Sequence, residues 1–141
     1  MITFLKAEEQ HQHSNGGGWV ANTAVVAASA YIGPDAWVSD NAQVCDNAWV
    51  CGDAQVYGDA CVCSHALVYS TAQVYGDAQV YGNARVYGDA QVYGNAQVCD
   101  NAWVCGDARV YGDARVCDHA RVYGQYAGAP YSGPVAAQEK I

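Results

Sequence analysis

The sequence predicts an all-β fold made of short parallel strands wound into a coil, and three observations predict it. An aliphatic residue, nearly always valine, recurs at every sixth position from Val20 to Val122 without insertion or deletion. An alanine precedes nearly every one of these residues by two positions. Pairs drawn mainly from Gly, Asp and Asn separate most of the units. A short fixed period over most of a chain indicates stacked repeats rather than a globule with one central core.

The unit Val74–Gln79, which reads Val-Tyr-Gly-Asp-Ala-Gln, shows how each position is used. Alanine, a variable residue, valine and then Tyr or Cys alternate along a strand of about four residues, so alternate residues share a face. The variable position holds Gln, Arg or Trp, which a narrow core could not easily absorb, so Ala and Val are expected to face inward. The remaining Gly, Asp and Asn residues tolerate the positive φ of a two-residue corner.

The segment Ile32–Val38, which reads Ile-Gly-Pro-Asp-Ala-Trp-Val, is similar to the repeat of the hexapeptide-repeat transferase superfamily. This resemblance covers residues 19–124 and implies a left-handed parallel β-helix with three hexapeptides per triangular coil. The eighteen units then make about six coils. The entry Gly17–Val20 also resembles an uncharacterised bacterial subgroup whose acetyltransferase label is inferred from its fold. In most units Gly lies one place later than in the superfamily's usual repeat, as in Val56–Asp59.

The repeat divides the chain into three segments. Residues 19–124 are expected to form one β-helical domain. Residues 1–18, with apolar side chains ahead of a polar stretch, are expected to cap the first coil, whose open edge would otherwise be exposed. Residues 125–141 lose the register of the repeat and are rich in Gly, Ala and Pro, so we expect a second cap or a loose tail.

Composition and charge limit the cellular setting and the partners. No basic leader with an apolar stretch begins the chain and no run is long enough to span a bilayer, so we expect a cytoplasmic protein without a membrane partner. The seven cysteines are odd in number and mostly occupy the position that otherwise holds Tyr, which favours reduced thiols. The formal net charge is −8 and few arginines lie in the repeat, so direct nucleic-acid binding is not expected.

With eighteen residues per coil, residues eighteen apart form columns, and each of three outer faces displays two columns. The first face is a ladder of Gln and Tyr, and the second is small and rich in thiols. The third is the most apolar, and we call it the aromatic face. Its aromatic and apolar residues are Tyr31, Trp49, Leu67, Tyr69, Tyr87, Trp103 and Tyr123.

The aromatic face is the candidate interface. Contiguous apolar patches usually mark contact sites, and aromatic residues are the most enriched there. We therefore expect a homo-oligomer, a dimer or trimer, or binding of another protein through this face. The alternative is that the stacked rings stabilise the rod laterally, without any partner.

The corners between the faces concentrate the negative charge. Carboxylates one or two coils apart could mimic a phosphate backbone, so the chain could act as a decoy for a nucleic-acid-binding protein. The simpler interpretation is that Asp serves the turn and solubility, because Asn takes the same positions freely. The column that we call the acidic edge contains Asp35, Asp53, Asp89 and Asp107.

His65 and His119 are the candidate catalytic residues if the chain is an enzyme. The resemblance implies an acyl or acetyl transfer from a coenzyme A thioester, with a histidine as general base and a donor site between subunits. The alternative is that both residues replace Asp or Asn at a corner. Against catalysis, no extruded loop interrupts the repeat. No metal site is expected, because four converging ligands are not apparent, and no cofactor is expected unless the chain uses acetyl-coenzyme A.

The leading prediction is a noncatalytic rod that self-associates or binds a protein through its outward aromatic and Cys columns. Acyl or acetyl transfer is the first alternative and an acidic decoy the second. His11 and His13 have no role that the sequence identifies.

Overall fold

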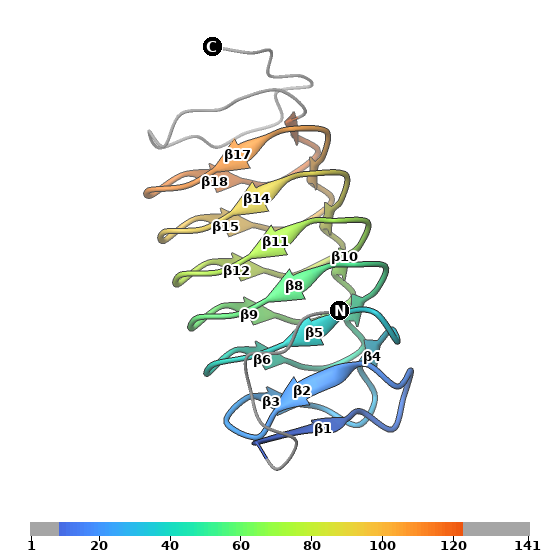
Figure 1. The fold of residues 1–141 in the computed structure, drawn as a ribbon. Coiled ribbons are helices and arrows are strands. Elements are labelled where there is room, and N and C mark those ends of the chain that lie inside the picture. Colours follow the sequence, from blue (N-terminus) through green and yellow to red (C-terminus); the bar gives the residue numbers. More distant parts are fainter. Residues whose placement is uncertain (1–8, 123–141) are drawn as a thin grey trace.

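The structure, a computed structural model, describes residues 9–122, and these form a parallel β-solenoid (Figure 1). Strands six residues apart follow one another around the coil, and strands eighteen residues apart pair in parallel to give three sheets. The chain rises through six coils with a left-handed sense (Figure 1). The predicted all-β fold with six coils of three repeats is confirmed.

The three sheets form the three sides of the coil, and every strand after β2 has two residues. The first sheet contains β1 (Gln10–Gln12), β2 (Trp19–Ala21), β5 (Trp37–Val38), β8 (Gln55–Val56), β11 (Gln73–Val74), β14 (Gln91–Val92) and β17 (Arg109–Val110). The second contains β3 (Val25–Val26), β6 (Gln43–Val44), β9 (Cys61–Val62), β12 (Gln79–Val80), β15 (Gln97–Val98) and β18 (Arg115–Val116). The third contains β4 (Tyr31–Ile32), β7 (Trp49–Val50), β10 (Leu67–Val68), β13 (Arg85–Val86), β16 (Trp103–Val104) and β19 (Arg121–Val122).

The regular strands are shorter than the four residues that the alternation predicts. In the unit that ends at Ala60, the backbone N–H of Ala60 donates to the carbonyl of Tyr57, at 3.4 Å, and so closes a tight turn. The N–H of Tyr57 still donates to the carbonyl of Val74 in the next coil, at 3.0 Å. The ladder between coils therefore extends beyond the strand, but the residues on either side of the corner belong to the turn.

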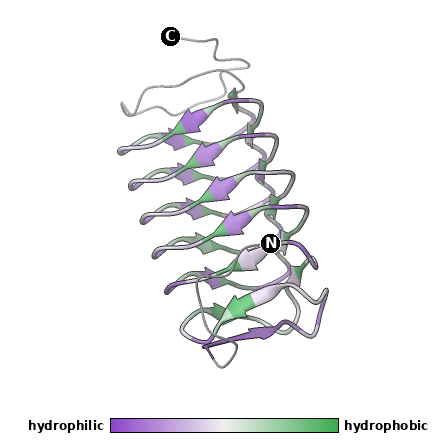
Figure 2. Ribbon diagram, in the orientation of Figure 1, coloured by the Kyte–Doolittle hydropathy of each residue, from purple (hydrophilic) through white to green (hydrophobic). Residues whose placement is uncertain are grey.

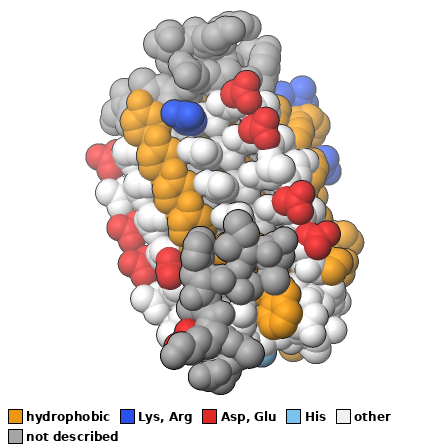
Figure 3. All heavy atoms as spheres, in the orientation of Figure 1, with side chains coloured by type: hydrophobic (Ala, Val, Ile, Leu, Met, Phe, Trp, Pro, Cys, Tyr) orange, Lys and Arg blue, Asp and Glu red, His pale blue; other side chains and the backbone are white. Residues whose placement is uncertain are grey.

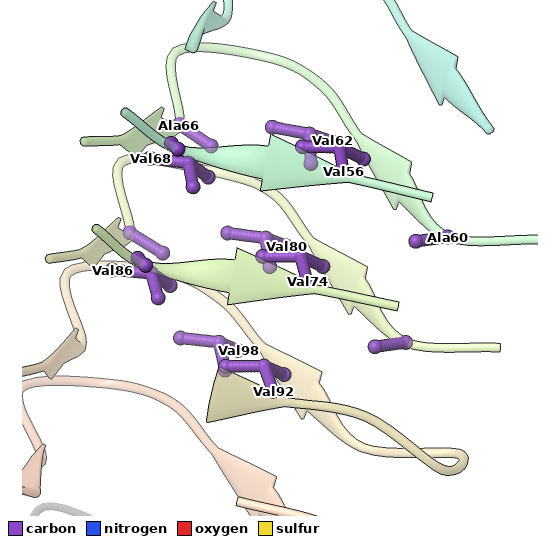
Figure 4. Close-up of a cluster of buried hydrophobic side chains, with 14 of the residues drawn as sticks. Val56, Ala60, Val62, Ala66, Val68, Val74, Val80, Val86, Val92 and Val98 are labelled. Atoms are coloured by element: carbon purple, nitrogen blue, oxygen red, sulfur yellow. The ribbon is translucent and has the colours of Figure 1, made fainter. Parts of the chain in front are cut away.

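The core is a column of alanine and valine, as the alternation predicts. Every inward-facing Ala, Val or Ile from Ala30 to Val122 is 0% exposed. Equivalent side chains stack from coil to coil, as Val56, Val74 and Val92 do in Figure 4. Figure 2 shows hydrophilic and hydrophobic residues alternating within the strands of the first sheet, so one residue of each strand faces outward and the other inward. Each coil thus buries its apolar side chains only by packing against its neighbours.

From Asp40 to Asp118 the first residue of every corner has a left-handed backbone. Gly takes this position at eight of the fourteen corners, with φ of 69° at Gly76, and Asp40, Asp46, Ser64, Ser70, Asp100 and Asp118 adopt φ between 57° and 62°. Three of the aspartates accept a backbone N–H from the coil above through Oδ2: Asp40 from Gly58, Asp46 from Ser64 and Asp100 from Asp118, at 3.0 to 3.2 Å. Asp therefore offsets part of the backbone strain by a hydrogen bond that Gly cannot make.

The N-terminal edge of the coil is covered by the segment before Trp19. Strand β1 pairs antiparallel with β2, opposite in sense to every other pairing in the sheets. His13 is only 7% exposed, and its Nε2 lies 2.8 Å from the carbonyl oxygen of Ala30. Asn15 donates from Nδ2 to the same carbonyl at 3.1 Å, and its backbone carbonyl accepts the N–H of Ile32 at 3.0 Å. Residues 9–18 thus satisfy backbone groups at the open edge of the first coil.

Two sequence expectations concern residues outside the described range. The expected apolar part of the N-terminal cap falls on residues 1–8, and the expected tail falls on residues 125–141. Residues 9–122 include no helix with the length and apolar character needed to cross a bilayer.

Candidate functional site

The lower half of the aromatic face presents an exposed tryptophan. Trp49 is 49% exposed, although its ring contacts that of Tyr31 with centroids 5.0 Å apart and planes tilted by 37°. Tyr69 and Tyr87 stack two coils higher, with centroids 4.9 Å apart and an interplanar angle of 3°. Leu67 is half-buried in the same coil as Tyr69, and its strand pairs with that of Trp49 in the coil below. The structure therefore brings six of the seven predicted interface residues to one sheet, and Tyr123 lies outside the described residues.

The upper half of the aromatic face is cationic as well as aromatic. Trp103 lies between two arginines, with the guanidinium carbons of Arg85 and Arg121 at 5.3 Å and 4.4 Å from its ring centroid. The rings of Trp103 and Tyr87 are nearly perpendicular, with centroids 6.2 Å apart and an interplanar angle of 71°. The sequence reasoning did not identify this cation–π sandwich, although the spacing of eighteen residues between Arg85, Trp103 and Arg121 predicts it.

The first face contains the most regular aromatic array, which we call the tyrosine ladder: Tyr57, Tyr75, Tyr93 and Tyr111. Successive ring centroids are 4.8, 4.9 and 5.3 Å apart, with interplanar angles of 1°, 4° and 9°. Figure 3 shows a continuous hydrophobic stripe across the coils of this face. The hydroxyls of Tyr57 and Tyr75 donate to Oε1 of Gln73 and Gln91, each at 3.3 Å. Burial raises the pKa of both tyrosines, so the hydroxyls remain donors at neutral pH.

A shallow hollow of about 340 Å³ lies at the lower end of the tyrosine ladder. Its walls are Trp37, Ser39, Asp40, Gln55 and Tyr57. The hollow arises because the column changes from Ser39 to Tyr57, so the small serine leaves space beside the last ring. Its walls include neither candidate histidine.

His65 and His119 stand at the same corner column, three coils apart, and both are exposed. The backbone N–H of His65 donates to the carbonyl of Gly82 at 2.9 Å, which is the turn bond that other residues make in this column. Neither imidazole forms a hydrogen bond to any residue within 9–122. The structure therefore does not bring the two histidines together or hold either ring in a fixed orientation.

The acidic edge follows the corner between the third and first sheets, and its four carboxylates are exposed. The backbone N–H groups of Asp53 and Asp89 donate to the carbonyls of Ser70 and Gly106, at 2.8 and 2.9 Å. The carboxylate of Asp89 accepts the hydroxyl of Thr71. At least part of this acidity is thus used in the hydrogen bonds of the turn.

The second face brings together three cysteines that the sequence reasoning did not group. Cys45, Cys61 and Cys63, which we call the thiol cluster, place their Sγ atoms within 4.8 Å of one another. Burial, with smaller contributions from Cys63 and Cys61, raises the pKa of the Cys45 thiol to about 12. The sequence analysis places these residues on the thiol-rich second face without identifying a cluster. The missed signal is that Cys61 and Cys63 are two residues apart and therefore share the outward face of β9 and its extension.

A second group of possible ligand atoms lies three coils above the thiol cluster. Cys99, Cys117 and the carboxylate of Asp100 also lie within 4.8 Å of one another. Cys99 is 7% exposed, and burial raises its pKa to about 11. Arg115 here occupies the position that Cys61 has in the lower group, so only two thiols converge.

The uninterrupted coil and its outer columns define the chain as a β-solenoid repeat protein. Segments of it match the family model described as the YdcK beta solenoid repeat, at residues 42–58, 78–94, 90–106, 96–112 and 102–117. No curated protein matches the chain, and no solved structure does. The match is to a repeat, and it supports the solenoid class.

Proposed function

We propose that the chain is a noncatalytic β-solenoid rod that pairs with a second copy of itself through the aromatic face. The observation that carries this proposal is the exposure of Trp49, which leaves 49% of a large aromatic residue in solvent on a flat sheet. Tryptophan is among the residues that contribute most at protein interfaces, and burying it against a partner removes apolar area from water. The stacking of Tyr69 on Tyr87 supports the same face, because it supplies a rigid aromatic surface at little entropic cost.

The charges around the aromatic face favour a parallel arrangement of the two rods. Arg85 begins β13, and Asp89 lies at the corner where the same coil leaves the third sheet. A two-fold axis parallel to the rods places the start of each strand in one copy opposite the end of the matching strand in the other. Arg85 of each copy then lies at the same edge of the interface as Asp89 of its partner. The pairing uses the same patch on both subunits.

The uninterrupted coil supports a noncatalytic role. Between Trp19 and Val122 every strand follows the preceding one at the same six-residue interval, and no loop leaves the coil. Function on repetitive scaffolds is carried by loops or by flat outer surfaces, and this segment offers only the surfaces. His65 and His119 are exposed corner residues, so their position fits the turn role that Asp and Asn have in the same column.

Sedimentation velocity of the full chain over a wide concentration range tests this proposal. The wild type is expected to sediment as a dimer, and Trp49→Glu as a monomer, because a buried charge without a partner opposes association. Gln79→Glu is the matched control, since Gln79 is exposed on the second face. A wild-type monomer at the highest concentration would overturn the proposal.

A charge-swap experiment tests the parallel arrangement separately. Arg85→Glu and Asp89→Arg should each weaken the dimer, because each places like charges opposite one another across the interface. The double variant should recover at least part of the lost association, since it restores opposite charges. A dimer that forms with wild-type affinity in both single variants would show that the rods pair in another orientation.

A further inference from the structure

We propose that Cys45, Cys61 and Cys63 form a binding site for a thiophilic metal ion such as Zn²⁺, which the three thiolates would ligate. This site is on the second face, so it is separate from the proposed interface. The proposal rests on the convergence of three thiols from two adjacent coils, whose Sγ atoms all lie within 4.8 Å of one another.

The backbone positions all three ligands on adjacent coils. Cys61 begins β9, Cys63 follows the same strand two residues later, and Cys45 follows β6 in the coil below. The N–H groups of Cys45 and Cys63 donate to the carbonyls of Val62 and Val80, each at 2.9 Å. Because the ladder holds the backbone, each thiol has only rotation about its Cα–Cβ bond, and little ordering is needed to bring the sulfurs together.

The sulfur positions are near those that a metal requires. All three Sγ atoms lie within 4.8 Å of one another. Tetrahedral zinc with Zn–S bonds of about 2.3 Å places its sulfur ligands about 3.8 Å apart. A contraction of roughly 1 Å or less, by side-chain rotation alone, therefore suffices. The sequence shows no four converging ligands, but in the structure Cys61 and Cys63 lie in different columns and face the same space as Cys45.

The electrostatic surroundings favour a cation once the thiols lose their protons. Burial raises the pKa of Cys45 and of Cys61, and the neighbouring Cys63 raises both further, so these two thiols hold their protons at neutral pH in the metal-free chain. The carboxylate of Asp46 adds to this effect on both residues. A divalent cation reverses the balance, because it stabilises all three thiolates at once and releases their protons.

The thiol cluster supplies three ligands, and its sulfurs are half-buried rather than enclosed. Structural zinc sites have four protein ligands, whereas sites that keep one position free use three. The fourth position here is open to water or to a small ligand. The geometry therefore predicts a site that exchanges its metal rather than one on which folding depends.

The upper group of ligand atoms provides a control within the same chain. Cys99 and Cys117 are in the same column, three coils above Cys45 and Cys63, but Arg115 replaces the third thiol. Asp100 already accepts the backbone N–H of Asp118 at 3.2 Å. Two thiols beside a fixed positive charge are a poorer site for a cation, so metal binding should be confined to the lower cluster.

Titration of the reduced, metal-free full chain with Co²⁺ and then Zn²⁺ tests the proposal. We expect one equivalent of Co²⁺ to produce sulfur-to-cobalt charge-transfer absorption with the visible bands of a tetrahedral site, and Zn²⁺ to displace it. Cys61→Ser should lower the Co²⁺ affinity by roughly 100-fold or more, since losing a ligand exceeds the ~10–100-fold cost of losing an outer-shell partner. Cys117→Ser should leave the affinity unchanged.

Each variant must also show the cooperative thermal transition of the wild type, so that lost binding is not confused with unfolding. A phosphine reductant, which carries no thiol of its own, keeps Cys45 and Cys63 from forming a disulfide. The proposal is overturned if Co²⁺ produces no charge-transfer band, or if Cys61→Ser and Cys117→Ser lower the affinity equally.

Discussion

The ring of Tyr57 lies flat on the ring of Tyr75, with centroids 4.8 Å apart and an interplanar angle of 1°. That spacing is the distance between neighbouring strands of a sheet, so the backbone ladder sets the separation of the rings. Tyr93 and Tyr111 continue the same stack. The tyrosine ladder therefore links four successive coils on the outside of the rod, while valine and alanine link them on the inside.

The position of a residue in the tyrosine ladder should set the cost of removing it. Tyr75 stacks on two rings, whereas Tyr57 stacks on one because Ser39 lies below it. At about 0.5–1.5 kcal/mol per aromatic pair, Tyr75→Ala should cost about 1–3 kcal/mol from lost stacking and Tyr57→Ala about half as much. Urea denaturation of both variants measures the difference.

The phenylalanine variants separate the stack from its hydrogen bonds. Tyr75→Phe keeps both ring contacts and removes only the hydroxyl that donates to Gln91. It should therefore lose about 1 kcal/mol or less. If Tyr75→Phe were as unstable as Tyr75→Ala, or if Tyr57→Ala were the less stable of the two alanine variants, stacking would not be the source of the stability.

The sequence predicts the coil because one period determines both the core and the turns. The return of Val every six residues, with Ala two positions before it, predicts which side chains are buried. Every side chain predicted in this way from Ala30 to Val122 is buried in the structure. The length of the strands was harder to predict from the sequence. Whether Ala60 and Tyr57 belong to a strand depends on the turn bond between their backbones, which alternation of side chains does not reveal.

The outer surfaces were harder to predict than the core. Column positions follow from a period of eighteen, and they correctly place Trp49 and Tyr69 on one sheet. Contacts across columns do not follow from it. Cys61 meets Cys45 from a different column, so its signal is the two-residue spacing from Cys63 rather than the period of eighteen. The buried His13 bonds Ala30 from outside the repeat and therefore has no periodic signal.

Corner glycines should be replaced with less loss by Asp than by Ala. Gly76 has φ of 69°, and a Cβ there would lie 2.8 Å from the backbone nitrogen of Gly94. Gly76→Ala should cost about 1–3 kcal/mol, because a left-handed backbone strains a residue with a side chain. Gly76→Asp should recover about 1 kcal/mol of this, since its carboxylate can accept the N–H of Gly94 as Asp40 accepts that of Gly58.

Urea midpoints of the two Gly76 variants test this prediction, with Gly76→Asn as the uncharged control. Asn keeps the acceptor oxygen and tolerates the left-handed conformation, so it should resemble Asp rather than Ala. Equal losses for Ala, Asp and Asn would mean that the close contact with Gly94 dominates and that the side-chain hydrogen bond contributes nothing.

The interior should not accept a larger side chain at an alanine position. Ala78 is 0% exposed inside the coil, and its neighbour Gln79 is exposed on β12. Ala78→Leu should destabilise the rod by about 1–3 kcal/mol through overpacking. Gln79→Leu adds the same side chain one residue away and should change the free energy of unfolding by about 0.5 kcal/mol or less. The reverse order would contradict the inward orientation of alanine.

The acyltransferase hypothesis predicts turnover of acetyl-coenzyme A that depends on His65 or His119. Because both imidazoles are exposed and form no hydrogen bond within residues 9–122, we expect neither turnover nor a thermal shift with acetyl-coenzyme A. His65→Ala and His119→Ala should melt at temperatures close to the wild type. A thermal shift that either substitution abolishes would instead support a donor site beside that histidine.

The stability of the rod should decrease as the pH rises above about 9. Burial, the largest cause in each case, raises the pKa of Cys45 and Tyr81 to about 12 from ordinary values of 9.0 and 10.0. Between the unfolded and folded pKa values the folded chain binds more protons than the unfolded chain, so the free energy of unfolding falls with rising pH. This contribution is complete below about pH 9 and is lost progressively toward pH 12.

Urea midpoints measured from pH 7 to 11 under reducing conditions test this pH dependence. The midpoint should stay nearly constant up to about pH 9 and then fall. Tyr81→Phe keeps the ring and removes the titrating hydroxyl, so its midpoint should fall less steeply over the same range. A midpoint that rises above pH 9, or a Tyr81→Phe curve parallel to the wild type, would show that burial does not hold the proton on this hydroxyl in the folded rod.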